Sequence, residues 1–258
     1  MLDQWQKHDG FLQHVNPTLK LISLICVVVG LVRVFDPWTP LIIMALTIYA
    51  INRLGGIPWK TIGWLLLPLS FFALSFIWIS VLFPNVRGQE VLFHIGSLPI
   101  ASENVVTGLA LGLRSLVFGL WSVLFVFTTE PTKLMLGLVQ HCKLPPRFGY
   151  GMMAAYRMIP HFRQDLNQIR SAHLIRGLGE SRGLRGRWEQ MKRYAIPLLA
   201  GAIRKAERVA IAMESKGFDG SRQRSYYRKI AWTRKDLLFG MGILCGAAAL
   251  LGVRQLWM

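Results

Sequence analysis

Residues 61–83 read TIGWLLLPLSFFALSFIWISVLF and contain no charged side chain. A helix needs about 20 apolar residues to cross the hydrocarbon core of a bilayer. A second run of the same length, VVTGLALGLRSLVFGLWSVLFVF at 105–127, carries a single charge, Arg114. Length and composition therefore predict a transmembrane helix over each of these two runs. Arg114 is interpreted as a side chain that reaches the outer interface, and the alternative is an anion or partner contact inside the bundle.

Three further apolar runs flank this pair, at 19–35, 38–51 and 236–253. The first two are short and are separated by Asp36-Pro37, so they predict a hairpin of two short spans, the alternative being one long re-entrant element. Residues 236–253 predict a last span. With 53% hydrophobic residues and a mean hydropathy of +0.39, the pattern predicts an all-α membrane protein with about five transmembrane helices.

The positive charge is concentrated between the last two predicted spans. Residues 141–235 hold 21 of the 30 Lys and Arg residues but only 6 of the 13 acidic ones, a net charge of +15. Such an excess is found in nucleic-acid-binding proteins and in cytoplasmic loops of membrane proteins. The segment lacks the interleaved aromatic residues of a stacking platform, apart from Trp188, Tyr194, Tyr226 and Tyr227. We therefore expect a cytoplasmic segment beside the lipid bilayer and no nucleic-acid partner.

This charge distribution sets the expected topology and domains. Basic residues favour the cytoplasmic side, which puts the N-terminus and the loop carrying Arg53 and Lys60 inside. We expect a multi-pass protein of the cytoplasmic membrane with three parts. They are four N-terminal spans in 1–127, a cytoplasmic domain in 128–235 and a C-terminal span in 236–258.

Two long helices are predicted in the cytoplasmic segment. In the first, apolar residues recur every three or four positions from Phe148 to Ile169, and Pro160 is expected to kink or divide the helix. In the second, a stripe of mostly small residues runs from Ala195 to Met213, which allows close packing on another helix, most simply the first. The stretch GLGESRGLRGR (177–187) between them reads as a loop.

Both helices end in a cation followed by glycine, in SAHLIRGLG (171–179) and AIAMESKGFDG (210–220). One interpretation is ordinary capping, because glycine adopts the left-handed conformation that closes a helix and a cation complements the helix dipole. The other interpretation is that Arg176 and Lys216 are two matching docking points, because both helices end on an exposed cytoplasmic surface.

Motifs for catalysis are missing from the sequence. It contains no G-x-x-x-x-G-K-[ST] nucleotide-binding loop and no G-x-S-x-G, so no catalytic residue is assigned. Cys26, Cys142 and Cys245 are far apart, and the histidines show no i, i+4 pair, so no metal site is expected. An alternative is a membrane enzyme acting on an anionic lipid or polyprenyl phosphate. Its phosphate site would be the Arg-rich stretch 176–193, and its carboxylates would be Asp165, Glu180 and Glu189.

Four stretches resemble one family over nearly the whole chain: HVNPTLKLIS (14–23), VLFHIGSLPIASENVVTGLALGLRSL (91–116), YRMIP (156–160) and AMESKGF (212–218). The family is the transmembrane T component of energy-coupling factor (ECF) transporters. The last stretch is the most specific, being similar to a family motif A-M-E-x-R-G-[FY]. The resemblance implies that two cytoplasmic coupling helices lie between the fourth and fifth spans and end in Ala-Arg-Gly motifs that insert into two ABC-type ATPases.

Carried over by position, these coupling motifs are Ile175-Arg176-Gly177 and Ser215-Lys216-Gly217. Both lack the family's alanine, and the second has Lys for Arg, so the ATPases are expected to be two different chains or two halves of one chain. The resemblance also implies a small substrate-binding S component that topples when ATP-driven motion reaches it. ATP would bind the partners, and this chain would hold no cofactor. The Met-Glu-Ser form of the second motif is similar to T components for thiamin precursors.

Overall fold

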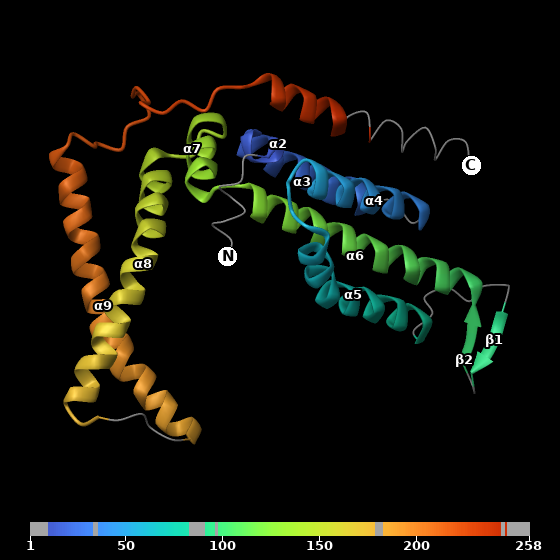
Figure 1. Cartoon of the computed structure of the whole chain (residues 1–258), viewed down its shortest axis with the longest axis horizontal. Coiled ribbons are helices and arrows are strands. Elements are labelled where there is room, and N and C mark those ends of the chain that lie inside the picture. The colour runs from blue at the N-terminus through green and yellow to red at the C-terminus, as the bar shows by residue number, and fades with distance from the viewer. Residues whose placement is uncertain are drawn as a thin grey trace. The chain divides into compact units, whose positions relative to one another are not determined.

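The computed structural model describes residues 10–32, 36–82, 91–95, 98–178, 183–243 and 246. These residues form helices and one short β-hairpin in two compact units (Figure 1). The first, which we call the bundle unit, contains the described residues up to Gly137 and from Ile230 onward. The second, the arm unit, is Leu138–Lys229 and falls inside the predicted cytoplasmic segment 128–235.

The bundle unit is built around one long helix. Its elements are α2 (Phe11–His14), α3 (Pro17–Val32), α4 (Trp38–Arg53), α5 (Trp59–Leu82), α6 (Ser102–Thr128), most of α7 (Pro131–His141) and a helix over 234–243. Helices α3, α4 and α5 each contact α6. Among the described residues, Trp59–Ser80 and Asn104–Thr128 are long and apolar enough to cross a membrane. These are the two runs from which the sequence predicted transmembrane helices.

The first two apolar runs form two helices, α3 and α4, rather than one continuous element. Each has 16 residues, which is about 24 Å of helix and shorter than a hydrocarbon core of about 30 Å. The helix over 234–243 begins the last predicted span. Most of the remainder of that span, to residue 253, lies outside the described residues. Helix α7 was not predicted.

Outside the helices, residues 91–101 depart from the all-α expectation. Strand β1 (Val91–Ile95) pairs with β2 (Leu98–Ala101) in an antiparallel hairpin, with Ile95 opposite Leu98. Branched and aromatic residues fit an extended strand well, and β1 contains Val91, Phe93 and Ile95. No strand was predicted for these residues.

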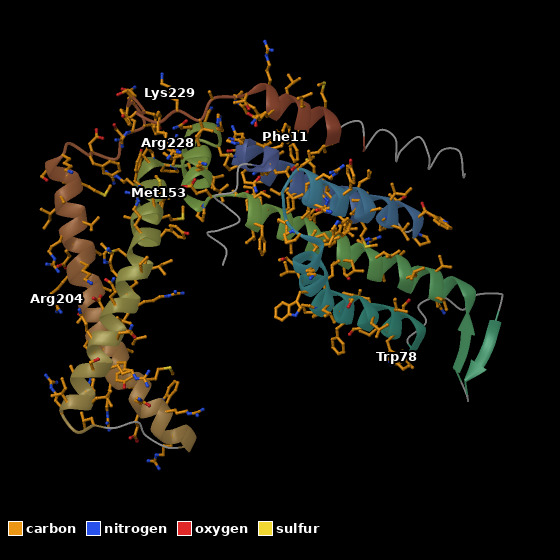
Figure 2. All side chains as sticks on the ribbon, in the orientation of Figure 1. Phe11, Trp78, Met153, Arg204, Arg228 and Lys229 are labelled. Atoms are coloured by element: carbon orange, nitrogen blue, oxygen red, sulfur yellow. The ribbon has the colours of Figure 1, made fainter. Side chains whose placement is uncertain are left out.

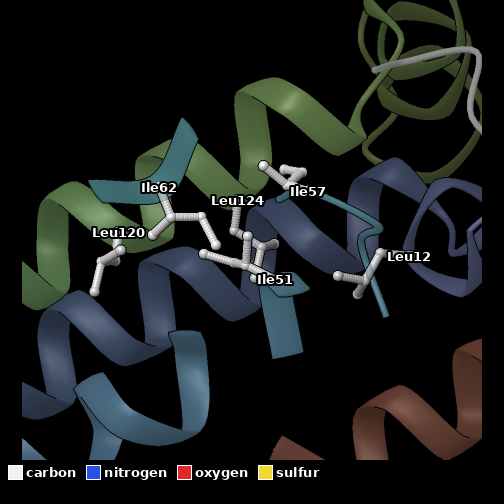
Figure 3. Packing of buried hydrophobic residues seen from close by; sticks show 6 residues of the cluster. All are labelled: Leu12, Ile51, Ile57, Ile62, Leu120 and Leu124. Atoms are coloured by element: carbon white, nitrogen blue, oxygen red, sulfur yellow. The ribbon is translucent and has the colours of Figure 1, made fainter. Parts of the chain in front are cut away.

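Two buried clusters hold the bundle unit together. Leu12, Ile51, Ile57, Ile62, Leu120 and Leu124 form the first, which joins α2, α4, α5 and α6 (Figure 3). A second cluster of Leu31, Val117 and Trp121 joins α3 to α6. The outward side of α5 is apolar as well: Trp78 is 65% exposed (Figure 2). An apolar surface of this kind fits a helix surrounded by lipid.

Glycines on α6 allow α5 to approach closely. A Cβ atom built on Gly112 would lie 3.0 Å from the carbonyl oxygen of Ala73 and 3.2 Å from Cγ1 of Ile77. One built on Gly108 would lie 3.0 Å from Cβ of Ser80. Helices in membranes associate through close van der Waals packing, and small residues make that packing available.

Arg114 lies in the middle of α6 and is only 8% exposed. The interpretation that its side chain reaches the outer interface is therefore wrong. The residue is covered by the bundle unit instead, because α3, α4 and α5 all pack on the central helix α6. This burial fits the alternative of a contact inside the bundle.

Buried polar groups tie both ends of the bundle unit to its centre. Asp236 is 2% exposed. It accepts hydrogen bonds from the backbone N–H of Asn16 at 2.6 Å and from the N–H and Oγ1 of Thr233 at 2.7 and 2.9 Å. Lys20 Nζ donates to the carbonyl oxygen of Thr128, at the end of α6, at 2.8 Å. These hydrogen bonds fix the N-terminal segment and the start of the last helix, and they satisfy the buried carboxylate of Asp236.

The arm unit consists mainly of α8 (Pro146–Ile175) and α9 (Gly183–Ser215), which contact and cross each other (Figure 1). Pro160 does not divide α8, and a kink there stays a prediction. Residues 183–187 belong to α9, so the loop predicted over 177–187 is shorter than expected. Glycine is a weak helix former but Leu and Arg are strong ones, which explains why the helix begins within this Gly-rich stretch.

Candidate functional site

The two predicted motifs lie where α8 and α9 end. We call Ile175-Arg176-Gly177 the first tip and Ser215-Lys216-Gly217 the second tip. Arg176 is the C-cap of α8, with φ −78° and ψ 7°, and Gly177 follows with φ +74°. Gly217 has φ +82° in the corresponding place after α9. Both glycines thus adopt the left-handed conformation that the sequence predicted.

The hydrogen bonds that close the two helices are equivalent. At the first tip, Leu178 N–H donates to the oxygen of His173 at 3.0 Å, and Gly177 N–H donates to Leu174 at 3.0 Å. At the second tip, Phe218 N–H donates to Met213 at 3.0 Å, and Gly217 N–H to Glu214 at 2.9 Å. This pair of bonds defines the Schellman motif, which satisfies carbonyls that a helix end otherwise leaves open.

The conformation of the tip glycines is imposed by the backbone and not by crowding. A Cβ atom at Gly177 or Gly217 would meet nothing within 4 Å. A side chain at either position would nevertheless be strained, because a positive φ disfavours every residue that carries a Cβ. Glycine is therefore favoured at both positions because it allows the backbone turn that ends each helix.

All six tip residues are exposed, and Ile175 is 87% exposed. Within the described part of the chain, the side chains of Arg176 and Lys216 make no hydrogen bond or ion pair. Each cation stands at the negative end of a helix dipole, which stabilises it by about 0.3–1 kcal/mol and leaves its donors available. Two equivalent exposed cations fit acidic partners outside this chain.

One ion pair joins the two helices between the tips. Lys205 Nζ on α9 lies 2.5 Å and 2.7 Å from the two carboxylate oxygens of Asp165 on α8. Their side chains are 28% and 24% exposed. Sequence reasoning missed this pair, although a lysine within an otherwise small and apolar helix face was a signal that an acidic partner faces it.

The ion pair is equally far from both tips. Asp165 precedes Arg176 by eleven residues, and Lys205 precedes Lys216 by eleven. Eleven residues make about three helical turns and rise about 17 Å, so each tip cation lies on the ion-pair side of its helix. The two helices cross, and their C-terminal ends lie on opposite sides of the crossing (Figure 1). Because the helices cross at an angle, the two lengths set an upper limit of roughly 33 Å for the distance between the tips.

The apolar stripe predicted on α8 is only partly covered. Phe148 is 66% exposed, Met152 41% and Ile159 47%, whereas Phe162 and Ile169 are half-buried. On α9, three residues at helical spacing are exposed, Ile196 at 71%, Leu199 at 63% and Ile203 at 59%. The expected contact of α9 with α8 is confirmed, but two crossing helices touch over a short length only, so parts of both faces stay uncovered.

Two of the carboxylates considered for a membrane enzyme are described by the structure, and each lies beside a basic residue. Asp165 is bound to Lys205, and Glu189 lies 4.0 Å from Arg185 on the same helix. Glu180 lies outside the described residues. Among the residues that the structure describes, no group of three His, Cys, Asp or Glu is placed to hold a metal ion.

Comparison with known proteins gives a consistent result. Residues 8–227 match the family model CbiQ, described as a cobalt transport protein. The chain is also similar to proteins named energy-coupling factor transporter transmembrane protein EcfT. That of Limosilactobacillus fermentum is 30% identical over 236 residues, covering 88% of this chain and 87% of the relative. That of Streptococcus thermophilus is 27% identical over 252 residues, covering 92% and 91%. That of Bacillus selenitireducens is 26% identical over 272 residues, covering 98% and 97%.

Proposed function

The chain belongs to the CbiQ family, as a non-catalytic EcfT-type transmembrane component of an energy-coupling factor transporter, and from this premise we propose how it works. Its two tips dock on two ABC-type ATPase subunits, or on the two halves of a fused pair. ATP-driven movement of these partners passes through α8 and α9 to a membrane-embedded S component, which binds and releases the nutrient. ATP binds the partners, and this chain holds no cofactor.

The observation that carries this proposal is the equivalence of the two tips. Each is a cation followed by a left-handed glycine, closed by the same two hydrogen bonds. Each lies eleven residues beyond the Asp165–Lys205 ion pair. Two similar partners that move relative to each other would meet two similar docking points at about equal distance from a shared crossing. Arg176 and Lys216 differ in hydrogen-bonding geometry, which supports partners that are similar but not identical.

The proposed topology has five spans, with the N-terminus and the coupling helices in the cytoplasm. Helices α5 and α6 support the third and fourth spans by length and composition. The net charge of +15 in residues 141–235 supports a cytoplasmic position for both tips. Arg53 and Lys60 support the same side of the membrane for the short loop between α4 and α5. The three proposed parts remain 1–127, 128–235 and 236–258.

The exposed apolar faces of the arm unit support the link to the S component. Phe148, Met152 and Ile159 share one face of α8, and Ile196, Leu199 and Ile203 share one face of α9. Exposed apolar faces of this kind usually mark an interaction site. A membrane-embedded partner has an apolar surface that would cover them. We assign these faces to the S component.

Charge reversal at both tips tests the docking. The variant Arg176→Glu/Lys216→Glu should insert into the membrane at the wild-type level but should lose co-purification with the ATPases. The matched control is Arg163→Glu/Arg204→Glu, which makes the same two changes at exposed positions of the same helices. The proposal fails if the tip variant still co-purifies with the ATPases, or if the control loses them equally.

A further inference from the structure

The segment that follows the second tip folds back onto the first turns of α8. Gly220 has φ +73°, and a Cβ atom there would lie 2.5 Å from both Cγ and Nε of Arg147. Nη2 of Arg147 donates to the carbonyl oxygen of Asp219 at 3.4 Å. The Asp219 carboxylate in turn accepts the backbone N–H of Ser221 at 2.9 Å. The turn after the second tip therefore has a fixed shape and lies against α8.

Arg224 closes this arrangement by lying against two aromatic rings. Its guanidinium carbon is 4.9 Å from the ring centre of Tyr150 on α8 and 4.9 Å from that of Phe218, the residue directly after Gly217. The two rings contact each other edge to face, with centres 5.5 Å apart. A cation over the faces of aromatic rings is attracted by their electron-rich centres.

The rings account for the placement of this arginine better than hydrogen bonds do. Nε and Nη1 of Arg224 are buried, and neither has a hydrogen-bond partner among the described residues. The hydrogen bonds that Ser221 donates to Asp219, together with the charge of Arg224, hold the pKa of the Asp219 carboxyl below its usual value. That carboxylate is therefore ionised at neutral pH and adds a favourable charge near Arg224. A lysine would keep the charge but lose the flat guanidinium that stacks on the rings.

Helix α9 contacts α8 on both sides of the Asp165–Lys205 pair within the arm unit. Toward the first tip, the rings of His173 on α8 and Tyr194 on α9 lie with their centres 5.5 Å apart. Toward the second tip, Arg224 contacts Tyr150 and Phe218 directly after the end of α9. This last contact, which we call the joint, restrains the C-terminal end of α9, because the other two lie ten or more residues before that end.

We propose that Arg224 is a positioning residue that holds the second tip against the first turns of α8. A movement of Lys216 then also moves α8 and is not lost in the segment after the tip. This inference rests on the proposed coupling function for its purpose, but the joint itself is a property of this chain alone. Tyr150 and Phe218 supply the rings, and Arg224 supplies the cation.

The joint is tested on the full chain in lipid nanodiscs without partners. Spin labels at Gly151 and Ser215, both exposed, are introduced after Cys26, Cys142 and Cys245 are replaced by serine. The wild-type background should give one narrow distance distribution. Arg224→Met, Arg224→Lys and Tyr150→Leu should broaden it, whereas Tyr150→Phe, which keeps the ring, and Arg222→Met, which removes a neighbouring exposed cation, should leave it narrow. A narrow distribution in Arg224→Met overturns the proposal.

Transmission is tested in the assembled complex with labels at Gly63 and Gly151. Trapping with Mg-ATP and vanadate should shift this distance in the wild-type background and in Arg222→Met. In Arg224→Met the complex should still co-purify with its ATPases, but the shift should be lost or clearly reduced. An undiminished shift in Arg224→Met overturns the inference about transmission. Failure of the proposed function would instead show as retained ATPases in the tip variant, and the distances in the chain alone would stay interpretable.

Discussion

Asp165 of α8 and Lys205 of α9 form an ion pair that lies eleven residues before Arg176 and eleven residues before Lys216. The two cations therefore stand at the ends of two helical arms of equal length, measured from a shared crossing. This symmetry offers a mechanical reason for having two similar tips. A displacement at one tip acts on the crossing with the same leverage as a displacement at the other.

Neutralising one member of the crossing pair should destabilise the arm unit. Asp165→Asn leaves Lys205 without its carboxylate in a site that is about three-quarters buried. We expect a loss of about 1–2 kcal/mol in the free energy of unfolding, between the values for exposed and buried pairs. Thermal unfolding of the purified full chain measures it. The exchange Asp165→Lys/Lys205→Asp should recover most of the loss, and an additive loss in the exchanged variant would contradict the pairing.

Alanine at the tip glycines should cost stability through the backbone alone. Gly177→Ala and Gly217→Ala each place a Cβ on a residue with positive φ, at a cost of about 1–2 kcal/mol. Asparagine should cost less, because it tolerates this conformation. The control Gly151→Ala lies inside α8, where nothing comes within 4 Å, and should be neutral or stabilising. Chemical denaturation of the full chain gives the values, and equal costs at Gly151 and Gly177 would refute the explanation.

The packing of α5 on α6 should be sensitive to the size of the residue at position 112. Gly112→Val places atoms against the backbone oxygen of Ala73, which cannot move without shifting α5. We expect a loss of about 1–3 kcal/mol, as for other overpacked interfaces. Gly119→Ala should cost less, because it meets only the flexible end of Leu69. The control Gly30→Ala faces open space. The melting temperature in detergent should follow this order, and a different order would count against close packing of α5.

Removal of the buried carboxylate of Asp236 should loosen both ends of the bundle unit. Asp236→Ala deprives the N–H groups of Asn16 and Thr233 of their acceptor in a site that is 2% exposed. An unsatisfied buried donor costs about 1–3 kcal/mol. Hydrogen exchange should become faster near residues 16–20 and 233–236 and stay unchanged in the arm unit. Thr233→Ser keeps the hydroxyl donor and serves as the control. Unchanged exchange near residue 16 would rule out this role.

Charges on the apolar face of α9 should weaken binding of the S component without affecting binding of the ATPases. Leu199→Asp/Ile203→Asp introduces carboxylates at positions that are 63% and 59% exposed, so folding of the arm unit should be little affected. We expect the variant to keep its ATPases in co-purification but to lose the S component. Arg208→Asp, on the same helix and also exposed, is the control. Retention of the S component by the double variant would remove this face from the proposed interface.

Several features follow from local sequence because their causes are local. An apolar run of 23 residues such as 61–83 has few options other than a membrane-spanning or fully buried helix, since lipid leaves no partner for open backbone groups. The closure of both tips was predicted for the same reason: the Schellman bonds join residues at most five positions apart, and Gly177 and Gly217 provide the required conformation.

Contacts between distant residues were decided by the tertiary structure. The sequence predicted stripes on α8 and α9 from periodicity, but the angle of the crossing decides which residues are covered, and Phe148 and Leu199 remain exposed. Arg114 was assigned to the interface because position along a helix does not reveal which side faces the bundle. The short β-hairpin went unnoticed because its pairing, and not its composition, makes it a sheet.

The sequence by itself thus determined the family, the helical class, the two long apolar helices and the two glycine-capped cationic ends. Only the tertiary structure brought Asp165 to Lys205, forty residues apart, and Arg224 to Tyr150, seventy-four residues apart. The physical reason is that a helix cap is complete within a few residues of one chain segment. An ion pair or a cation–ring contact between helices forms only when their crossing has already set the distance between them.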